Sequence, residues 1–294
     1  MGAQLFDVIA CAESTLQIAM YEAEWSCLGA ALEAALEQNP ALTIEIVTDD
    51  ERCAPGACLF DALDTSDRVT VVRDNRDGYM HHKWVVADGE RLWVSSANFS
   101  QRSYCVDHNN AIVVDEPEIV GAYQTLFTEM LGGAFAPVPR EPLVAGSYTV
   151  YFSPDSPTTE SADWQDEIVA AIEAATTRVD VLINAWTVDT FAAALVGAHE
   201  RGVEVRILVS HLYADGGPPQ TALERGIEVR RDNIHDKTIV IDDVVFTGSA
   251  NWSVNARTNN ENVLAIRDAT VAAAYRARFD AQFADARPVE DATP

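Results

Sequence analysis

Lysine occurs only twice in the 294-residue chain, and Lys83 and Lys237 stand in the same setting. Each lysine follows a histidine by two positions, His81 or His235, and precedes an aspartate by five. An imidazole can serve as nucleophile, acid or base near neutral pH, and an ammonium group stabilises anionic oxygens. The repeated pair therefore indicates chemistry on a negatively charged group, and a phosphodiester is a substrate that needs all of these parts.

Phosphodiesters react slowly because their negative charge repels nucleophiles and an alkoxide is a poor leaving group. Two histidines and two lysines would meet both difficulties. One neutral imidazole attacks phosphorus, the other protonates the leaving oxygen and then activates water, and the lysines hold the non-bridging oxygens. Alternation along a strand puts His81 and Lys83 on one side and His82 on the other. We expect the two pairs to flank one phosphate.

An internal duplication surrounds the two pairs. The segment Ser95-Ser96-Ala97-Asn98 follows the first pair, and Gly248-Ser249-Ala250-Asn251 follows the second at nearly the same separation. We predict that the amides of Asn98 and Asn251 hold phosphate oxygens beside the lysines. Because repeated segments mark repeated structural units, the sequence predicts two homologous halves.

Hydrophobic periodicity predicts the same order of elements in each half. In the first half, the predicted strands are 16–21, 42–47 and 110–114, followed by a helix at 116–131. In the second half, they are 179–185, 203–209 and 262–266, followed by a helix at 269–283. Three prolines between positions 137 and 142 break the periodicity. The prediction is a first unit at 1–135, a linker at 136–147, a second unit at 148–287 and a flexible tail at 288–294.

The duplicated pattern H-x-K-x4-D, followed by Gly/Ser-Ser-x-Asn, resembles the signature of the phospholipase D superfamily, and the compactness resembles its bacterial nuclease-like branch. The resemblance covers nearly the whole chain. It implies an α/β fold of two α-β-α units related by a pseudo-twofold axis, with mixed sheets flanked by helices and one active site at their interface. It also implies a phosphohistidine intermediate, no cofactor and no metal. His81 would be the nucleophile and His235 the general acid, and the reverse assignment is open.

The resemblance also suggests supporting roles for six polar residues: Asp88, Ser96, Asn109, Asp242, Ser249 and Glu261. The two aspartates are either structural supports or turn residues, and the two serines either bind phosphate or pack a turn. Glu261 matches the family acid that orients a motif histidine and would raise the pKa of that imidazole. Its counterpart in the first half is Asn109, and Ser95 stands where the second motif has Gly248. We therefore expect the halves to divide the labour.

Net charge bears on the choice of substrate. With 20 basic against 46 acidic residues, the formal charge is −26, which should repel nucleic acid and anionic membranes but not zwitterionic phospholipid. Five arginines that precede the motifs could form a local basic rim that admits nucleic acid: Arg73, Arg76, Arg225, Arg230 and Arg231. The sequence leaves phospholipid and nucleic acid open as substrates. It also leaves open two alternatives to a hydrolase, a phosphatidyl or phosphoryl transferase and a non-catalytic phosphate-binding protein.

Cysteine usage and hydropathy bear on metal content and compartment. The five cysteines fit no two-pair zinc spacing, and Cys53 and Cys58 could close a disulfide loop, whose state is open. The chain has no run of 18 apolar residues and no signal-peptide pattern at its start. A cytoplasmic location and secretion with a removed leader both stay open. Because one chain holds both motifs, we expect a monomer without an obligate protein partner.

Overall fold

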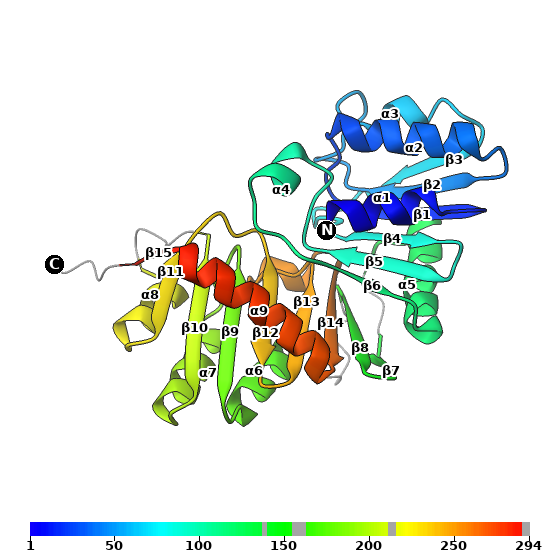
Figure 1. The fold of residues 1–294 in the computed structure, drawn as a ribbon. Coiled ribbons are helices and arrows are strands. Elements are labelled where there is room, and N and C mark those ends of the chain that lie inside the picture. Colours follow the sequence, from blue (N-terminus) through cyan, green and yellow to red (C-terminus); the bar gives the residue numbers. More distant parts are fainter. Residues whose placement is uncertain (137–139, 155–162, 211–215, 290–294) are drawn as a thin grey trace.

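The computed structural model describes residues 1–136, 140–154, 163–210 and 216–289, which contain two mixed sheets flanked by helices (Figure 1). The first sheet has the strand order β3-β2-β1-β4-β5-β6. Strands β1, β2 and β3 are parallel, and β4, β5 and β6 join them in antiparallel pairs. The strands are β1 Thr15–Met20, β2 Thr43–Thr48, β3 Val69–Arg73, β4 Lys83–Ala87, β5 Arg91–Ser95 and β6 Ala111–Val114.

The second sheet repeats this arrangement and extends it, in the order β15-β11-β10-β9-β12-β13-β14-β8-β7. From β11 to β14, each strand matches one of the first sheet in order and direction. The predicted duplication and the mixed α/β fold are confirmed. The strands are β7 Leu143–Ala145, β8 Tyr148–Ser153, β9 Arg178–Ile183, β10 Glu204–Val209, β11 Glu228–Arg231, β12 Lys237–Ile241, β13 Val244–Gly248, β14 Glu261–Arg267 and β15 Arg287–Pro288.

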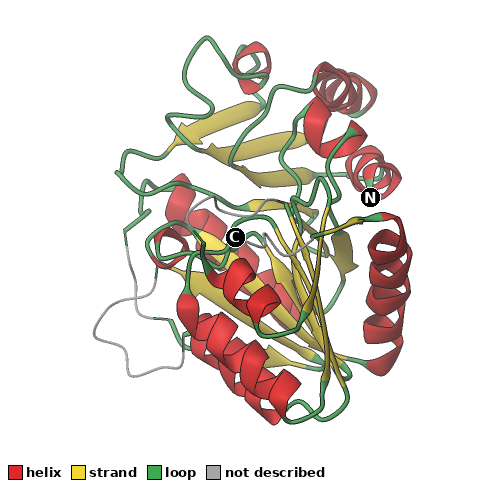
Figure 2. Cartoon of the chain, turned by 90° about the vertical axis from the view of Figure 1, so that its left-hand side faces the viewer, coloured by secondary structure: helices red, strands yellow, loops and turns green. Residues whose placement is uncertain are grey.

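Helices cover both sheets (Figure 2). Helices α1 and α2 pack on one face of the first sheet, and α6 and α7 pack on the matching face of the second. Side chains of α5 and α9 enter a core that both sheets share. The helices are α1 Gly2–Ala10, α2 Ser26–Gln38, α3 Phe60–Leu63, α4 Gln101–Cys105, α5 Pro117–Leu131, α6 Trp164–Ala174, α7 Asp189–Glu200, α8 Pro218–Glu224 and α9 Ala269–Asp285, with a 3-10 turn at Asn255–Arg257.

Strand alternation on β4 distributes side chains between two cores. Val85 packs in the core beneath α1 and α2, whereas Trp84 points into the shared core. Trp84 is fully buried, and its ring lies 5.3 Å from that of Tyr123 on α5. Val240 and Leu264 join the same core from the second half. The shared core therefore holds the strands that carry both motifs in a fixed relation.

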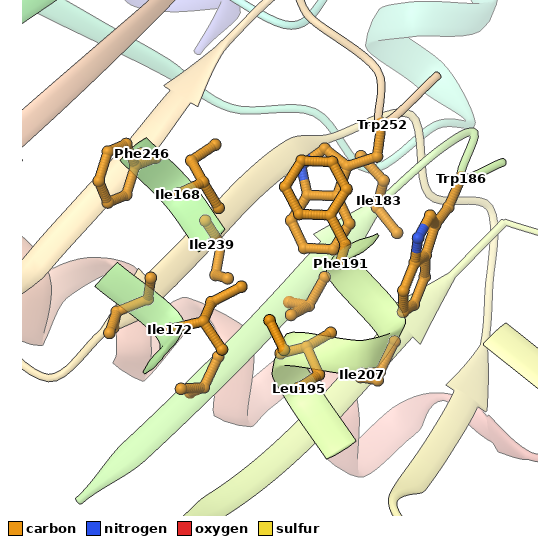
Figure 3. Packing of buried hydrophobic residues seen from close by; sticks show 14 of the residues in the cluster. Ile168, Ile172, Ile183, Trp186, Phe191, Leu195, Ile207, Ile239, Phe246 and Trp252 are labelled. Carbon is orange, nitrogen blue, oxygen red and sulfur yellow. The ribbon is translucent and has the colours of Figure 1, made fainter. Parts of the chain in front are cut away.

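The core of the second half supports the segment that follows its motif (Figure 3). Trp252 stacks on Phe191 with ring centroids 4.2 Å apart, and Trp186 meets Trp252 edge-on at 5.2 Å. Aromatic pairs of this kind stabilise a fold beyond their buried area. Because Trp252 directly follows Asn251, this packing fixes the backbone from which the predicted phosphate-binding amide projects.

Several boundaries differ from the prediction. The segment 136–147, expected to be a linker, contains β7, which pairs with β8 and forms the edge of the second sheet. A strand of three residues depends on its partner, so local periodicity did not predict it. At the other end, Pro288 belongs to β15 and not to a tail, and 290–294 lie outside the described residues. Among the described residues, no helix has both the length and the apolar character needed to cross a membrane.

Candidate active site

The motif histidines lie where the two halves meet. The backbone N–H of His81 donates to the carbonyl of Asn260, and that of His235 donates to the carbonyl of His108, both at 3.0 Å. Isolated bridges between Met80 and Asn260 and between His108 and Ile234 continue these contacts. The residues that lead into each motif strand are therefore hydrogen-bonded to the opposite half.

The side chains of both histidines also find partners across the interface. His81 Nδ1 lies 2.8 Å from Glu261 Oε2, and His235 Nδ1 lies 3.0 Å from Asn109 Oδ1. The Ser96 hydroxyl donates to the same Asn109 oxygen at 2.8 Å, and the Ser249 hydroxyl accepts the N–H of Asn262 next to Glu261. The sequence predicted that Glu261 orients a histidine without saying which one. The structure pairs it with His81 through Nδ1 of the imidazole.

Both lysines are buried beside their histidines. Lys83 Nζ donates to the backbone carbonyl of His81 at 2.6 Å and lies 4.9 Å from the ring centroid of Tyr21. Lys237 Nζ donates to the carbonyl of His235 and lies 3.4 Å from His235 Nε2. Among the described residues, neither ammonium group forms an ion pair. Burial lowers the pKa of both lysines, so an anion bound between them would favour their protonated forms.

Burial governs the protonation of these groups. It lowers the pKa of His81 well below its usual value, and the charges of Lys83 and Lys237 lower that pKa further. It likewise lowers the pKa of His235, again with help from the two lysines. The pKa of Lys237 falls to about 7 because of burial. We expected the Glu261 carboxylate to raise the pKa of the histidine that it orients, which the structure identifies as His81. That pKa is instead lowered, because desolvation of the imidazolium outweighs its attraction to the carboxylate.

The predicted asparagines follow corresponding strands, Asn98 after β5 and Asn251 after β13. Asn98 is 7% exposed, and its Nδ2 donates to Glu22 Oε2 at 2.9 Å. In the described part of the chain, the Oδ1 atoms of Asn98 and Asn251 are buried without a hydrogen-bond partner. An unpaired buried amide oxygen costs about 1–3 kcal/mol, so it is tolerated best where a water molecule or another donor completes its bonding, whereas only the amide nitrogen can donate to a phosphate oxygen.

The motif aspartates stand away from the reacting groups, at the ends of their strands. Asp88 and Asp242 have positive φ angles of 55° and 44°, a conformation that aspartate adopts in turns. The Asp88 carboxylate accepts the backbone N–H groups of Glu13, Ser14 and Thr15. Asp242 accepts those of Thr176, Thr177 and Arg178. Each aspartate therefore ties the strand that carries the lysine to the start of its neighbour.

Replacing Asp242 by alanine should destabilise the fold by about 1–3 kcal/mol, because three backbone donors lose their acceptor and alanine is strained at positive φ. Asparagine should cost less, since it tolerates that φ. The accepted hydrogen bonds lower the pKa of Asp242 despite the opposing effect of burial. Its stabilisation is thus present above pH about 4 and is lost as pH falls further. Urea unfolding checks this, with the exposed neighbour change Asp243→Ala as control, and equal effects of the two changes would contradict it.

A second, buried layer of polar contacts supports the motifs and was not predicted. Asp236, between His235 and Lys237, is fully buried, and it accepts from Asn110 Nδ2 at 2.6 Å and from Arg278 Nη2 at 2.7 Å. Its counterpart His82 lies 3.3 Å from Asn262, and burial lowers the pKa of His82 to about 3. As expected, His82 points away from the candidate site. The sequence signal that could have indicated this buried layer was the polar residue directly after each motif histidine, His82 or Asp236.

Three of the five arginines predicted to form a basic rim are paired with carboxylates. Arg73 pairs with Asp61 at 2.6 Å, Arg230 pairs with Glu228 at 2.8 Å, and Arg225 pairs with Glu200. Arg76 Nη2 donates to Asn260 at 2.8 Å. An acidic surface thus supplies carboxylates to Arg73, Arg225 and Arg230, whereas Arg76 bonds a neutral amide oxygen. Arg73 instead holds the loop that Cys53 and Cys58 close with a disulfide, through the Cys53 carbonyl.

Comparison with known families agrees with the fold and the motif geometry. A family model described as the PLD-like domain of cardiolipin synthase matches residues 5–131 and 168–283. Because these two matches cover well over half of the chain, the chain belongs to this family of phospholipase D-like domains. The described residues contain no group of three or more His, Cys, Asp or Glu side chains placed to hold a metal ion.

Individual relatives match parts of the chain. Mitochondrial cardiolipin hydrolase of Xenopus tropicalis is 34% identical over 110 residues, which are 35% of this chain and 52% of that protein. Phospholipase D of Rickettsia prowazekii (strain Madrid E) is 34% identical over 119 residues, which are 37% of this chain and 57% of the relative. The chain thus spans about half the length of the curated relatives that it matches.

A solved structure resembles the whole chain. Phosphatidylserine synthase of Haemophilus influenzae Rd KW20 matches with a TM-score of 0.72 at 13% identity, covering 98% of this chain and 85% of the other. At this identity the likeness shows the fold alone. It agrees with the two-unit arrangement of mixed sheets described above.

Proposed function

We propose that the protein is a phosphodiesterase of the phospholipase D type, which hydrolyses a phospholipid diester through a phosphohistidine without using a metal ion. The observation that carries the proposal is that both His-Lys pairs, each with a buried lysine, lie where the two halves meet, with each histidine in contact with a side chain of the opposite half. Units 1–135 and 148–287 then form one site together. One chain supplies every part of it, so a monomer suffices.

In the proposed first step, His81 is the nucleophile. Glu261 accepts the Nδ1 proton of His81, so the Nε2 lone pair is available to attack phosphorus. The bond from phosphorus to the leaving oxygen breaks, and His235 gives its proton to that oxygen. Lys83, Lys237 and the asparagine amides stabilise the charge on the non-bridging oxygens.

In the second step, His235 accepts a proton from water while the water oxygen attacks phosphorus. The bond between phosphorus and His81 breaks, which restores a neutral His81 and leaves a phosphate monoester. Burial and the lysines lower the pKa of His235, so its proton must be held by the negative charge of the bound substrate. The approach of a phosphodiester would therefore help to prepare the acid that it needs.

Phospholipid is favoured over nucleic acid by the charge distribution. The net charge of −26 repels a polyanion, and three of the five arginines that could offset it are paired with carboxylates. The names of the relatives, cardiolipin hydrolase and phospholipase D, also designate action on phospholipids. Transfer to an alcohol uses the same covalent intermediate, and added ethanol would reveal it as a phosphatidylethanol product.

Hydrolysis of bis(p-nitrophenyl) phosphate should persist in excess EDTA, because the lysines supply the charge stabilisation that a metal would otherwise give. Vesicles of zwitterionic phosphatidylcholine should release choline, and single-stranded DNA should be cleaved much more slowly. Loss of activity in EDTA with recovery on adding metal would overturn metal independence. Preferred cleavage of DNA would overturn the substrate class. Binding of phosphate without turnover of any substrate would leave a phosphate-binding protein.

A further inference from the structure

One wall of the candidate site differs between the two halves. Lys83 pairs with Met20 in the first sheet and Lys237 pairs with Ile183 in the second, so the residues that follow β1 and β9 correspond. Glu22 therefore stands where the second half has Ala185. The backbone bonds agree, because the Glu22 carbonyl accepts the N–H of Phe99 at 2.9 Å and the Ala185 carbonyl accepts that of Trp252 at 3.0 Å.

This difference places a carboxylate beside one phosphate-binding amide only. Glu22 Oε2 accepts a hydrogen bond from Asn98 Nδ2 at 2.9 Å, whereas an alanine side chain offers Asn251 no such acceptor. An amide nitrogen carries two hydrogens, and a carboxylate partner defines which end of the amide is the nitrogen. Glu22 thus fixes the rotation of the Asn98 amide and leaves its second N–H for a ligand.

The same carboxylate brings a second negative group, besides Glu261, to the site that holds the two lysines. Burial lowers the pKa of Lys83. The Glu261 carboxylate opposes that shift, and the Glu22 carboxylate opposes it with a smaller effect. The field of Glu22 therefore reaches the ammonium group that would hold the phosphate. A group bound between Lys83 and Asn98 would feel repulsion from Glu22 in proportion to its own charge.

We propose that Glu22 is a positioning and specificity-determining residue, which fixes the Asn98 amide and disfavours dianionic phosphate monoesters relative to monoanionic diesters. The inference rests on the proposed function, which puts the reacting phosphate beside Asn98. The product of that reaction is itself a monoester, so Glu22 would weaken product retention. The second half, with Ala185, contributes no such discrimination.

The test compares Glu22→Gln and Glu22→Ala with a matched surface change, Glu24→Gln. Glu24 is exposed and lies two residues further along the chain. The inhibition constant of phenyl phosphate is measured against hydrolysis of bis(p-nitrophenyl) phosphate at pH 8, where the monoester is a dianion, and at pH 5, where it is mainly a monoanion. In Glu22→Gln, the ratio of that constant to KM should fall about tenfold at pH 8 and little at pH 5.

The positioning role has its own readout. Glutamine retains an oxygen that can accept from Asn98, so Glu22→Gln should lower kcat less than Glu22→Ala, which should lower it about tenfold. Equal inhibition ratios in Glu22→Gln, Glu24→Gln and the unsubstituted protein would overturn the specificity role. A kcat in Glu22→Ala equal to that of Glu22→Gln would overturn the positioning role.

The outcome can be separated from failure of the proposed function. If the unsubstituted protein hydrolyses no diester, the proposed function fails, but calorimetry still measures binding of phenyl phosphate to each variant. Tighter binding to Glu22→Gln at pH 8, with unchanged binding to Glu24→Gln, would support the inference. Indistinguishable binding to all three proteins would overturn it.

Discussion

Replacing His81 by alanine should lower kcat/KM for bis(p-nitrophenyl) phosphate by about a thousandfold or more, because the reaction loses its nucleophile. His235→Ala should behave differently on this substrate. Nitrophenolate leaves without being protonated, so His81 can still be phosphorylated, but no base remains to activate water for the second step. A burst of one nitrophenol per protein molecule followed by slow turnover is the expected result.

The covalent intermediate can be located directly in the same experiment. Mass spectrometry of His235→Ala, digested at neutral pH because phosphohistidine is acid-labile, should find the added nitrophenyl phosphate on the peptide that contains His81. His81→Ala should give neither the burst nor the adduct. His199→Ala, on α7 and outside the candidate site, serves as the control for loss of a histidine as such. An adduct on His235 in the His81→Ala protein would reverse the roles of the two histidines.

The chemistry-bearing residues were predictable because their geometry is local. Each lysine is the first residue of its strand, Lys83 of β4 and Lys237 of β12, and each histidine precedes it by two positions, so alternation predicts that each pair shares one side. The duplication then required two equivalent strands. Predicting that both pairs serve one phosphate needed only the assumption that the two halves face each other.

The cross-half partners were less accessible to sequence reasoning. Asn109 and Glu261 were singled out, but pairing each with the histidine of the other half depends on how the two sheets pack through their shared core. Glu22 was not predicted at all. It reaches Asn98 because the turn after β1 lies against the turn after β5, a contact between segments 76 residues apart. Nothing in the local pattern around Glu22 reports that approach.

Burial also limited what the sequence could predict about protonation. A carboxylate next to a histidine normally raises the histidine pKa, and that expectation holds for exposed pairs. Here the pair is enclosed by both halves, so the uncharged forms of both partners are favoured. Burial raises the pKa of Glu261 to about 7, although Lys83 opposes the shift. The degree of enclosure is a property of the assembled interface and not of either segment.

This enclosure leads to a prediction about pH. Glu261→Gln should reduce kcat about a hundredfold, because a glutamine amide cannot carry the charge that compensates the forming phosphohistidine and can hold His81 in the wrong tautomer. In the unsubstituted protein, kcat/KM should fall as pH drops through about 7, since Glu261 then becomes protonated. It should also fall at higher pH as Lys237 loses its proton, because burial lowers the pKa of Lys237 to about 7.

The acidic side of this bell-shaped profile reports Glu261 and the alkaline side reports Lys237, so Glu261→Gln should change only the acidic side. Glutamine does not titrate, so Glu261→Gln should lose the acidic side while keeping the alkaline side. Glu167→Gln, a change of a partly exposed carboxylate that pairs with Arg267 on the protein surface, should leave both sides in place. An acidic side that persists in Glu261→Gln would assign that titration to another group, such as His81. In that case Glu261 would orient the imidazole without controlling its charge, and the asymmetry between Glu261 and Asn109 would need a different explanation.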